Sequence, residues 1–171
     1  YINHVKKHLD YWCNDVQELE GGFKWLTTWG CLRYSETTAF LSEVACDTIL
    51  SNDSNKDKYI QFAEDQVNYA LGENPDRQSY VVGYTPDGST DYKTPHNPHH
   101  RSAHSSWCNS LDYPEDNTHT LYGALVGGPT QNGEYEDSRG NYINNEVACD
   151  YNAGFTAVLC KMVSQYGGKT D

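Results

Sequence analysis

Apolar side chains recur three and four positions apart along four stretches of the chain, which is the spacing of one buried helix face. The first stretch runs from Ile2 to Leu19 and stops at Gly21-Gly22. The second covers about residues 36–50 and has a predicted buried side that consists of Phe40, Leu41, Val44, Ala45 and Ile49. Both stretches predict amphipathic helices.

Two further helices are predicted later in the chain. One covers about residues 57–71, where Gly72 supplies a C-terminal cap and Asn74-Pro75 prevents continuation. The other covers about residues 146–166 and ends at Gly167-Gly168. The chain is therefore predicted to be all-α.

Residues between Glu73 and Asn145 show little periodicity. Within this stretch we expect a short helical piece over residues 118–126 and an extended loop segment over residues 79–83 without an obvious pairing partner. Structureless connections of this length are uncommon in compact domains unless they are functional or disordered. The stretch is rich in His, Tyr and Asn and also contains a Trp, which is not the composition of disorder. We therefore expect it to be ordered and to build a site.

The amino-acid composition excludes some classes of binding partner. With 12 Lys and Arg against 24 Asp and Glu, the net charge is −12, and no basic patch is expected that could bind nucleic acid or an anionic membrane. No apolar run of about 18 residues exists, so the sequence predicts no membrane span. At 171 residues, the chain is long enough for one domain with a core, covering residues 1–171.

The cysteines indicate an oxidising compartment. They number six and include no Cys-x-x-Cys pair, which fits disulfides better than a zinc site. In addition, Asn52-Asp53-Ser54 is a glycosylation sequon. We therefore expect a secreted, extracellular protein.

An aromatic cluster lies between the first two predicted helices. Trp29 is followed closely by Arg33 and Tyr34, where an inter-helix loop would face a cleft. Aromatic residues in such a loop are commonly part of the core. A ring, a guanidinium and a phenol together also suit stacking on a sugar and hydrogen bonding to its hydroxyls. Both interpretations stay open.

Five of the seven histidines lie between residues 96 and 119. His100, His104 and Cys108 have a spacing that superficially indicates zinc, although His-Glu-x-x-His is absent and Pro98 interrupts any helix through the cluster. A hydrogen-bonded structural loop is a second interpretation. Sugar binding is the third, because neutral His and Arg side chains donate to hydroxyls.

Acids, amides and tyrosines are concentrated in residues 135–153. Asn144-Asn145 is predicted to cap the last helix, which would place Glu146 in its first turn. A carboxylate is favourable there in itself. A general acid must hold its proton, so desolvation by Tyr151 and bound substrate would have to outweigh the helix dipole. The spacing fits both a plain first-turn acid and a proton donor.

At these clusters the chain resembles the C-terminal part of the catalytic domain of glycoside hydrolase family 9, the cellulase family E. The second signature of that family is matched by Tyr135-x-Asp137, Tyr142, Glu146, Ala148 and Asn152-Ala153. The end of the first signature is matched by Pro98-His99-x-Arg101, while the stretch before it is longer than in the family. The similarity spans nearly the whole chain.

The resemblance implies an all-α (α/α)6 toroid, of which this chain supplies roughly the C-terminal 40%. It implies an endo-β-1,4-glucanase that acts with inversion, with Glu146 as general acid. Asp137 and His99 are further active-site residues, and Asp137 is expected to order the site. The side chains implied to contact sugar are Trp29, Arg33, Tyr34, Arg101 and Tyr151.

Inversion needs a second carboxylate, roughly 6.5–9.5 Å from the first, to activate water. In the family this base comes from an Asp-Ala-Gly-Asp type of motif near the start of the catalytic domain, and no such motif occurs here. The expected partners are therefore an N-terminal remainder of the catalytic domain and a β-1,4-glucan or cello-oligosaccharide substrate. No cofactor and no metal are expected in this chain, although the full domain in this family sometimes has calcium.

Three rival functions fit the same residues. An exo-acting or processive cellulase, or a glucosaminidase of the same family, would differ in other loops. A carbohydrate-binding remnant of the fold would lack catalysis. A metal-binding module would use His99, His100, His104 and Cys108.

Overall fold

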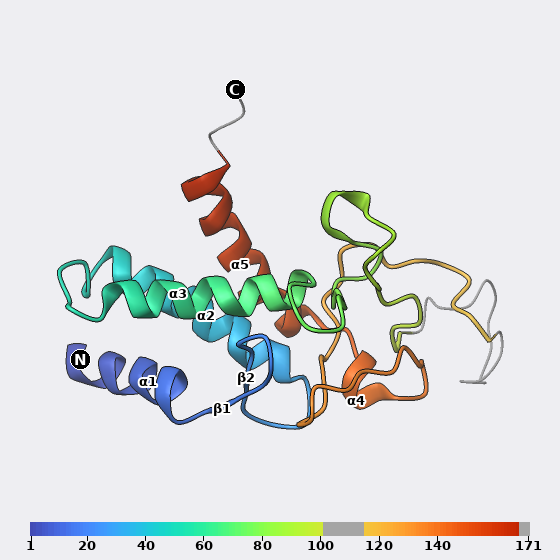
Figure 1. Ribbon diagram of the computed structural model, residues 1–171, viewed down its shortest axis with the longest axis horizontal. Helices are drawn as coiled ribbons and strands as arrows, with labels where there is room; N and C mark the ends of the chain where they lie inside the picture. Colours follow the sequence, from blue (N-terminus) through green and yellow to red (C-terminus); the bar gives the residue numbers. More distant parts are fainter. Residues whose placement is uncertain (101–114, 168–171) are drawn as a thin grey trace.

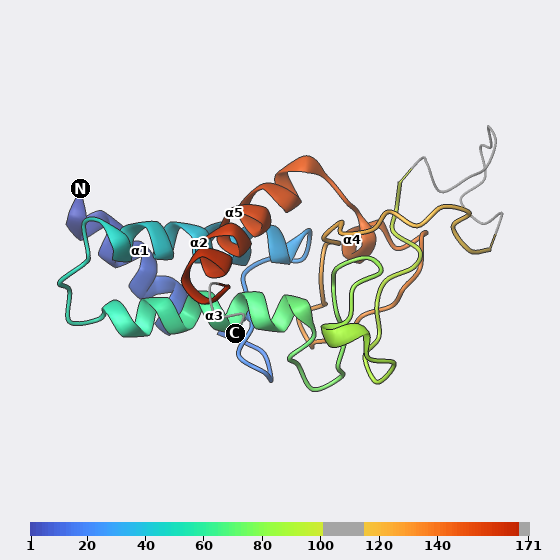
Figure 2. The same cartoon turned by 90° about the horizontal axis from the view of Figure 1, so that it is seen from above.

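Four long helices carry the fold in the computed structural model, which describes residues 1–100 and 115–167. They are α1 (Ile2–Asn14), α2 (Cys31–Asp47), α3 (Lys56–Leu71) and α5 (Cys149–Tyr166). The helices occupy one side of the molecule, and the loops that follow α3 gather on the other (Figures 1 and 2). Within this loop region lie a 3₁₀ turn, Pro86–Gly88, and the short helix α4, Tyr142–Asn145.

The first helix ends earlier than predicted. After Asn14, the chain forms an antiparallel hairpin of β1 (Gln17–Glu18) and β2 (Lys24–Trp25), in which Gln17 lies opposite Trp25. The buried side chains of Val16 and Leu19 reach the core from this hairpin and not from a helix. The prediction of a helix as far as Leu19 is therefore wrong.

Helix α2 begins earlier than predicted and buries a different side. The predicted buried residues Leu41, Val44 and Ile49 are 48%, 42% and 49% exposed. Ala45 is buried as predicted, and the other buried residues of the helix are Cys31, Leu32, Ser35, Glu36, Thr38, Ala39, Ser42, Glu43 and Cys46. Helices α3 and α5 pack against α2, whereas its apolar side borders a groove of about 390 Å³ beside α1.

Helices α2 and α5 run side by side in the same direction. Arg33 pairs with Asp150 at their first turns, with 2.7 Å between Nη1 and Oδ2. Further along both helices, Lys161 Nζ lies 2.5 Å from Asp47 Oδ2. Helix α3 returns antiparallel to α2. The start of α5 is thereby held close to the start of α2.

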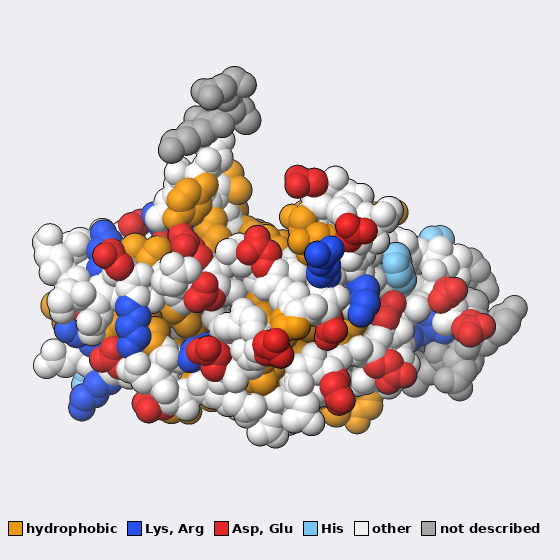
Figure 3. Space-filling view, viewed as in Figure 1, with side chains coloured by type: hydrophobic (Ala, Val, Ile, Leu, Met, Phe, Trp, Pro, Cys, Tyr) orange, Lys and Arg blue, Asp and Glu red, His pale blue; other side chains and the backbone are white. Residues whose placement is uncertain are grey.

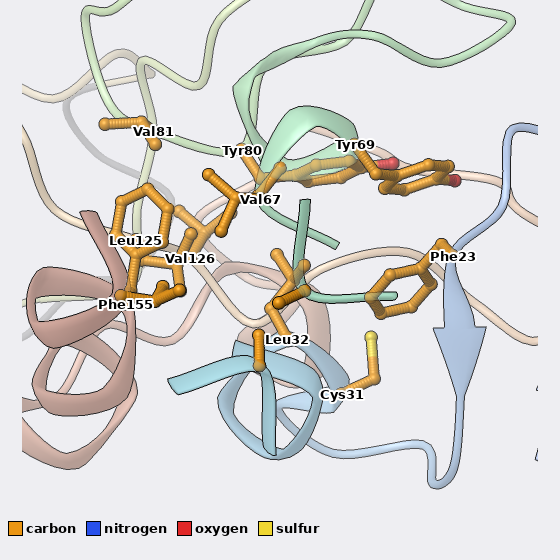
Figure 4. Packing of buried hydrophobic residues seen from close by; sticks show 14 of the residues in the cluster. Phe23, Cys31, Leu32, Val67, Tyr69, Tyr80, Val81, Leu125, Val126 and Phe155 are labelled. Atoms are coloured by element: carbon orange, nitrogen blue, oxygen red, sulfur yellow. The ribbon is translucent and has the colours of Figure 1, made fainter. Parts of the chain in front are cut away.

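The core joins the helices to the loops. Figure 4 shows Leu32, Val67 and Phe155 from three helices packed with loop residues such as Tyr80 and Leu125. Aromatic rings continue this cluster, since Phe23 and Tyr69 stack with their centroids 4.8 Å apart.

Residues 79–83 have a pairing partner, contrary to expectation. Val82 N donates to Ala124 O at 2.9 Å, and Val126 N donates to Tyr80 O at 3.1 Å. The predicted helix over residues 118–126 is therefore wrong, because Leu125 and Val126 enter the core from an extended segment. The described parts of the long aperiodic stretch thus pack into the same core as the helices.

The predicted disulfides are absent from the cysteines that the structure describes. Cys13, Cys31, Cys46, Cys149 and Cys160 are free, and Cys108 lies outside the described residues. The two exposed cysteines both lie on α5, about 16 Å apart along its axis, which is too far for a disulfide. Cys31 and Cys46 are buried, and burial raises the pKa of the Cys46 thiol to about 11.

Candidate active site

Glu146 lies between two helices. It follows α4 with an extended backbone (φ −59°, ψ 140°), and α5 begins only at Cys149. The prediction that Glu146 occupies the first turn of the last helix is therefore wrong. Asn141 caps α4 by accepting a hydrogen bond from Asn144 N, and this separate short helix moves Glu146 out of α5.

The backbone beside Glu146 is paired with the histidine cluster. His99 N donates to Asn145 O at 2.8 Å, and His99 and Glu146 form a parallel bridge. His99 Nδ1 lies 2.8 Å from the carbonyl oxygen of Arg139, so this nitrogen is the donor. Nε2 is left as the polar ring atom available to a ligand.

The carboxylate of Glu146 receives two side-chain hydrogen bonds on one oxygen. Trp29 Nε1 donates to Oε2 at 2.6 Å, and the Tyr151 hydroxyl donates to the same oxygen at 2.8 Å. Burial, followed by the nearby Glu146 carboxylate, raises the pKa of Tyr151 far above its ordinary value. The hydroxyl therefore remains protonated and serves as a permanent donor.

A glycine at position 30 allows Trp29 and Tyr151 to donate to the same oxygen of Glu146. It precedes α2 with φ +60°, a conformation that favours glycine. A Cβ at this position would lie 2.5 Å from the Tyr151 hydroxyl. The absence of a side chain at Gly30 thus leaves space for the Tyr151 ring and hydroxyl.

Tyr151 is a buried residue that supports the carboxyl group of Glu146. Its side chain is only 1% exposed, and its hydroxyl is occupied by Glu146. The geometry favours a positioning role over the predicted sugar contact. The Arg33 guanidinium lies 4.9 Å from the Tyr151 ring centre and donates to the Tyr34 hydroxyl at 2.8 Å.

Exposed aromatic rings surround the acid. Trp29 and Tyr142 are each 46% exposed, and their ring centroids lie 5.1 Å apart. His99 approaches Tyr142 edge-on at 6.0 Å. Tyr142 was not predicted as a ligand contact, although it lies only four residues before Glu146 in the sequence.

Asp137 is hydrogen-bonded to the start of the histidine loop. Its two oxygens accept hydrogen bonds from the backbone N–H groups of His96 and Asn97, both at 2.9 Å. Asn97 in turn accepts from Asn117 N at 2.8 Å. With both oxygens used in this way, Asp137 fixes the loop that carries His99, which supports the ordering role predicted for it.

Two buried asparagines support the segment before the acid. Asn144 Nδ2 donates to Gly128 O at 2.6 Å, and Asn145 Nδ2 donates to Glu136 O at 2.7 Å. The Tyr135 hydroxyl also donates to Asn145 Oδ1. These asparagines were predicted to cap the last helix, and their supporting role was not predicted.

The structure brings most of the predicted site residues together. Those that lie around Glu146 are Trp29, Arg33, Tyr34, His99 and Tyr151. Arg101 lies outside the described residues, and so do His104 and Cys108 of the zinc interpretation. Within residues 1–100 and 115–167, no three His, Cys, Asp or Glu side chains are grouped so that they could hold a metal ion.

Comparisons with known proteins extend this description. Residues 1–159 match the family model described as Glycosyl hydrolase family 9. Endoglucanase A of Bacillus pumilus is 43% identical over 98% of this chain and 26% of its own length. The chain therefore spans about a quarter of this curated relative.

Two solved structures have the same fold. Endoglucanase CelQ from Clostridium thermocellum, complexed with cellotriose, is 49% identical over 94% of this chain and 27% of its own, with a TM-score of 0.85. The endoglucanase from the termite Nasutitermes takasagoensis is 36% identical over 96% of this chain and 37% of its own, with a TM-score of 0.82. These likenesses confirm the predicted all-α fold as part of an (α/α)6 toroid.

Proposed function

Because this chain belongs to glycosyl hydrolase family 9, we propose that it supplies the general-acid half of an endo-β-1,4-glucanase active site. Glu146 is the proton donor to the glycosidic oxygen. The observation that carries the proposal is the convergence of Trp29 and Tyr151 on one oxygen of Glu146, within a group of exposed aromatic rings.

The two donors determine which oxygen of Glu146 acts as the acid. Oε2 already accepts the Trp29 and Tyr151 hydrogen bonds. A proton on Oε2 would compete with both of them, so the transferable proton belongs on Oε1. The donors thereby fix the rotation of the carboxyl group and direct Oε1 toward the bond that is cleaved.

The substrate of the proposal is a neutral β-1,4-glucan. Exposed Trp29, Tyr34 and Tyr142 offer ring faces for sugar stacking. The net charge of −12 disfavours anionic polymers and does not repel a neutral one. CelQ, whose structure contains cellotriose, has the same fold over this region.

The general base belongs to a further, N-terminal part of the catalytic domain. Inversion requires a second carboxylate roughly 6.5–9.5 Å from the acid. Near Glu146, Asp150 is paired with Arg33, while both oxygens of Asp137 are occupied by backbone N–H groups. Asp137 therefore has no oxygen free to activate water, and the positive charge of Arg33 makes Asp150 a weak base. The isolated chain is therefore expected to hydrolyse no glucan, and activity of the purified chain alone would contradict this part of the proposal.

The proposal includes secretion, because a glucan polymer of cellulose type is degraded outside the cell. Among the described helices, none combines the length and apolar composition that a membrane crossing requires.

The test of the acid is Glu146→Gln in the intact parent enzyme, assayed on carboxymethylcellulose. Glutamine keeps the shape of the side chain and has no transferable proton, so kcat is expected to fall about 10²- to 10⁴-fold. Glu136→Gln is the matched control, because Glu136 is an exposed acid in the loop that precedes α4. Near wild-type activity of Glu146→Gln would overturn the assignment. Products from cellohexaose and chitobiose separate endo-cleavage from exo-cleavage and from glucosaminidase activity.

A further inference from the structure

The turn that joins α2 to α3 carries a candidate modification site. It contains the sequence Asn52-Asp53-Ser54, and no other asparagine in the sequence has Ser or Thr two residues later. From the structure of this turn, we propose that Asn52 is the acceptor of an N-linked glycan when the chain passes through a eukaryotic secretory pathway.

The fold does not need an asparagine at this position. Asparagine is common in turns because its side chain bonds to the backbone two residues on, or because it tolerates a positive φ. Here Asp53 makes that bond, since its Oδ1 accepts from Asn55 N at 2.9 Å. Asn52 is not among the non-glycine residues with positive φ in the described chain, which are Arg77 and Asp87.

Asp53 also anchors the turn. Its Oδ2 lies 2.6 Å from Lys6 Nζ on α1, so the middle residue of the sequon is directed toward the protein. Asn52 and Ser54 on either side are both exposed. In the described part of the chain, neither of their side chains makes a hydrogen bond, so the amide nitrogen of Asn52 is free to react.

A glycan on Asn52 would not cover the proposed active site. Helix α2 starts beside the acid, at Cys31, and its 17 residues span about 25 Å. Asn52 follows the opposite end of that helix. A glycan on Asn52 would therefore extend from the end of the helical layer that is far from Glu146.

The transfer that forms the glycan is chemically balanced. The donor is a lipid-linked oligosaccharide diphosphate. Asn52 Nδ2 forms a bond to the anomeric carbon of the first sugar and loses one proton. The bond between that carbon and the diphosphate oxygen breaks, and the lipid diphosphate leaves with the electron pair. No oxidant or reductant is needed.

The test is mass spectrometry of the chain secreted from yeast. Peptides that contain Asn52 are expected to carry an oligosaccharide, and removal by a glycan-cleaving amidase should leave an aspartate at position 52. If the chain is not secreted, translation with microsomes gives the same readout as a gel shift. An unmodified Asn52 in chain that has entered the secretory pathway would overturn the proposal.

Matched variants make the test specific. Asn52→Gln and Ser54→Ala are both expected to abolish the modification completely. Ser51→Ala removes the same hydroxyl from an exposed neighbour outside the sequon and is expected to keep it. A glycan that persists in Asn52→Gln would contradict the assignment. None of these readouts depends on glucanase activity, so this proposal and the proposed function can fail separately.

Discussion

At the scale of single residues, the position of the Glu146 carboxyl group depends on neighbours that are far away in the sequence. Trp29 and Tyr151 come from opposite ends of the chain, and both donate to Oε2. Gly30 leaves room for the Tyr151 ring. The acid is thus oriented by contacts that form only when α2 and α5 lie together.

Tyr151→Phe removes one of these donors and leaves the ring in place. A hydrogen bond to a charged group contributes about 1.5–3 kcal/mol, so kcat of the intact enzyme is expected to fall about 10- to 100-fold. KM should stay near its wild-type value, because the buried ring does not touch the substrate. Tyr166→Phe, on an exposed part of α5, is the control. A rise in KM with kcat unchanged would indicate a sugar contact instead.

At the scale of helices, α2 is unusual because it buries carboxyl groups. Glu36 and Glu43 lie on the side packed in the protein, and both are 0% exposed. Neither oxygen of Glu36 has a hydrogen-bond partner within the described residues. Burial raises the pKa of Glu36 from 4.5 to about 8.

This burial predicts how stability depends on pH. Because the pKa of Glu36 is higher in the folded chain, the folded state holds an extra proton between the two values, and the free energy of unfolding falls as pH rises from about 4.5 to about 8. The loss amounts to roughly 1.4 kcal/mol per pKa unit. Glu36→Gln stays neutral and should flatten this fall in urea unfolding. Exposed Glu20→Gln should not, and parallel profiles for wild type and Glu36→Gln would contradict the prediction.

The contact between α2 and α5 depends on a residue without a side chain. A Cβ at Gly154 would lie 2.5 Å from Thr37 Oγ1 and 2.7 Å from Thr37 Cα. Gly154→Ala is therefore expected to push the helices apart and to lower the free energy of unfolding by roughly 1–3 kcal/mol. Thr156→Ala on the exposed side of α5 should change it by less than about 0.5 kcal/mol. Equal urea midpoints for the two variants would refute the close contact.

Helix α3 could be predicted from the sequence almost to the residue, whereas α2 and residues 118–126 could not. The apolar stripe of α3 faces a core inside this chain, and Gly72 ends the helix in a left-handed conformation. The apolar side of α2 instead borders the groove beside α1, so periodicity identified the helix but not its buried face. Residues 118–126 were predicted to be helical, but backbone pairing of residues 124 and 126 with residues 80 and 82 makes this end of the segment extended.

The site residues were predicted from the resemblance to a family, whereas the helices were predicted from the spacing of apolar residues. Spacing alone left Glu146 undecided between a helix-start residue and an acid, because the partner Trp29 is 117 positions away. The resemblance to the family predicted a set of residues that the structure places close together around Glu146. It did not reveal that Asn144 and Asn145 are buried supports, since their hydrogen bonds depend on how the loops pack.

At the scale of the molecule, apolar surface remains uncovered. Leu41, Val44 and Ile49 line the groove between α1 and α2. The outer end of α5 carries a second apolar area, visible in Figure 3, with Val163 66% exposed and Tyr166 58% exposed. Exposed apolar patches of this kind mark surfaces that pack against other protein.

The isolated chain is therefore expected to associate in solution. Size-exclusion chromatography with light scattering should give a mass above the 19.3 kDa of one chain, rising with concentration. Val44→Lys should reduce this association by placing a charge in the groove, whereas Asn132→Lys changes an exposed loop residue outside the groove and serves as the control. A concentration-independent monomer would contradict the prediction.

The hydrogen bond between His99 and Asn145 also has a consequence for chimaeras made by recombining the gene of this protein with those of its relatives. That backbone bond and the Asp137 contacts join residues 96–99 to residues 137–146. A crossover between these segments would take the acid from one parent and the loop that supports it from another. In a shuffled gene library, active chimaeras should therefore concentrate among those that inherit both segments from the same parent.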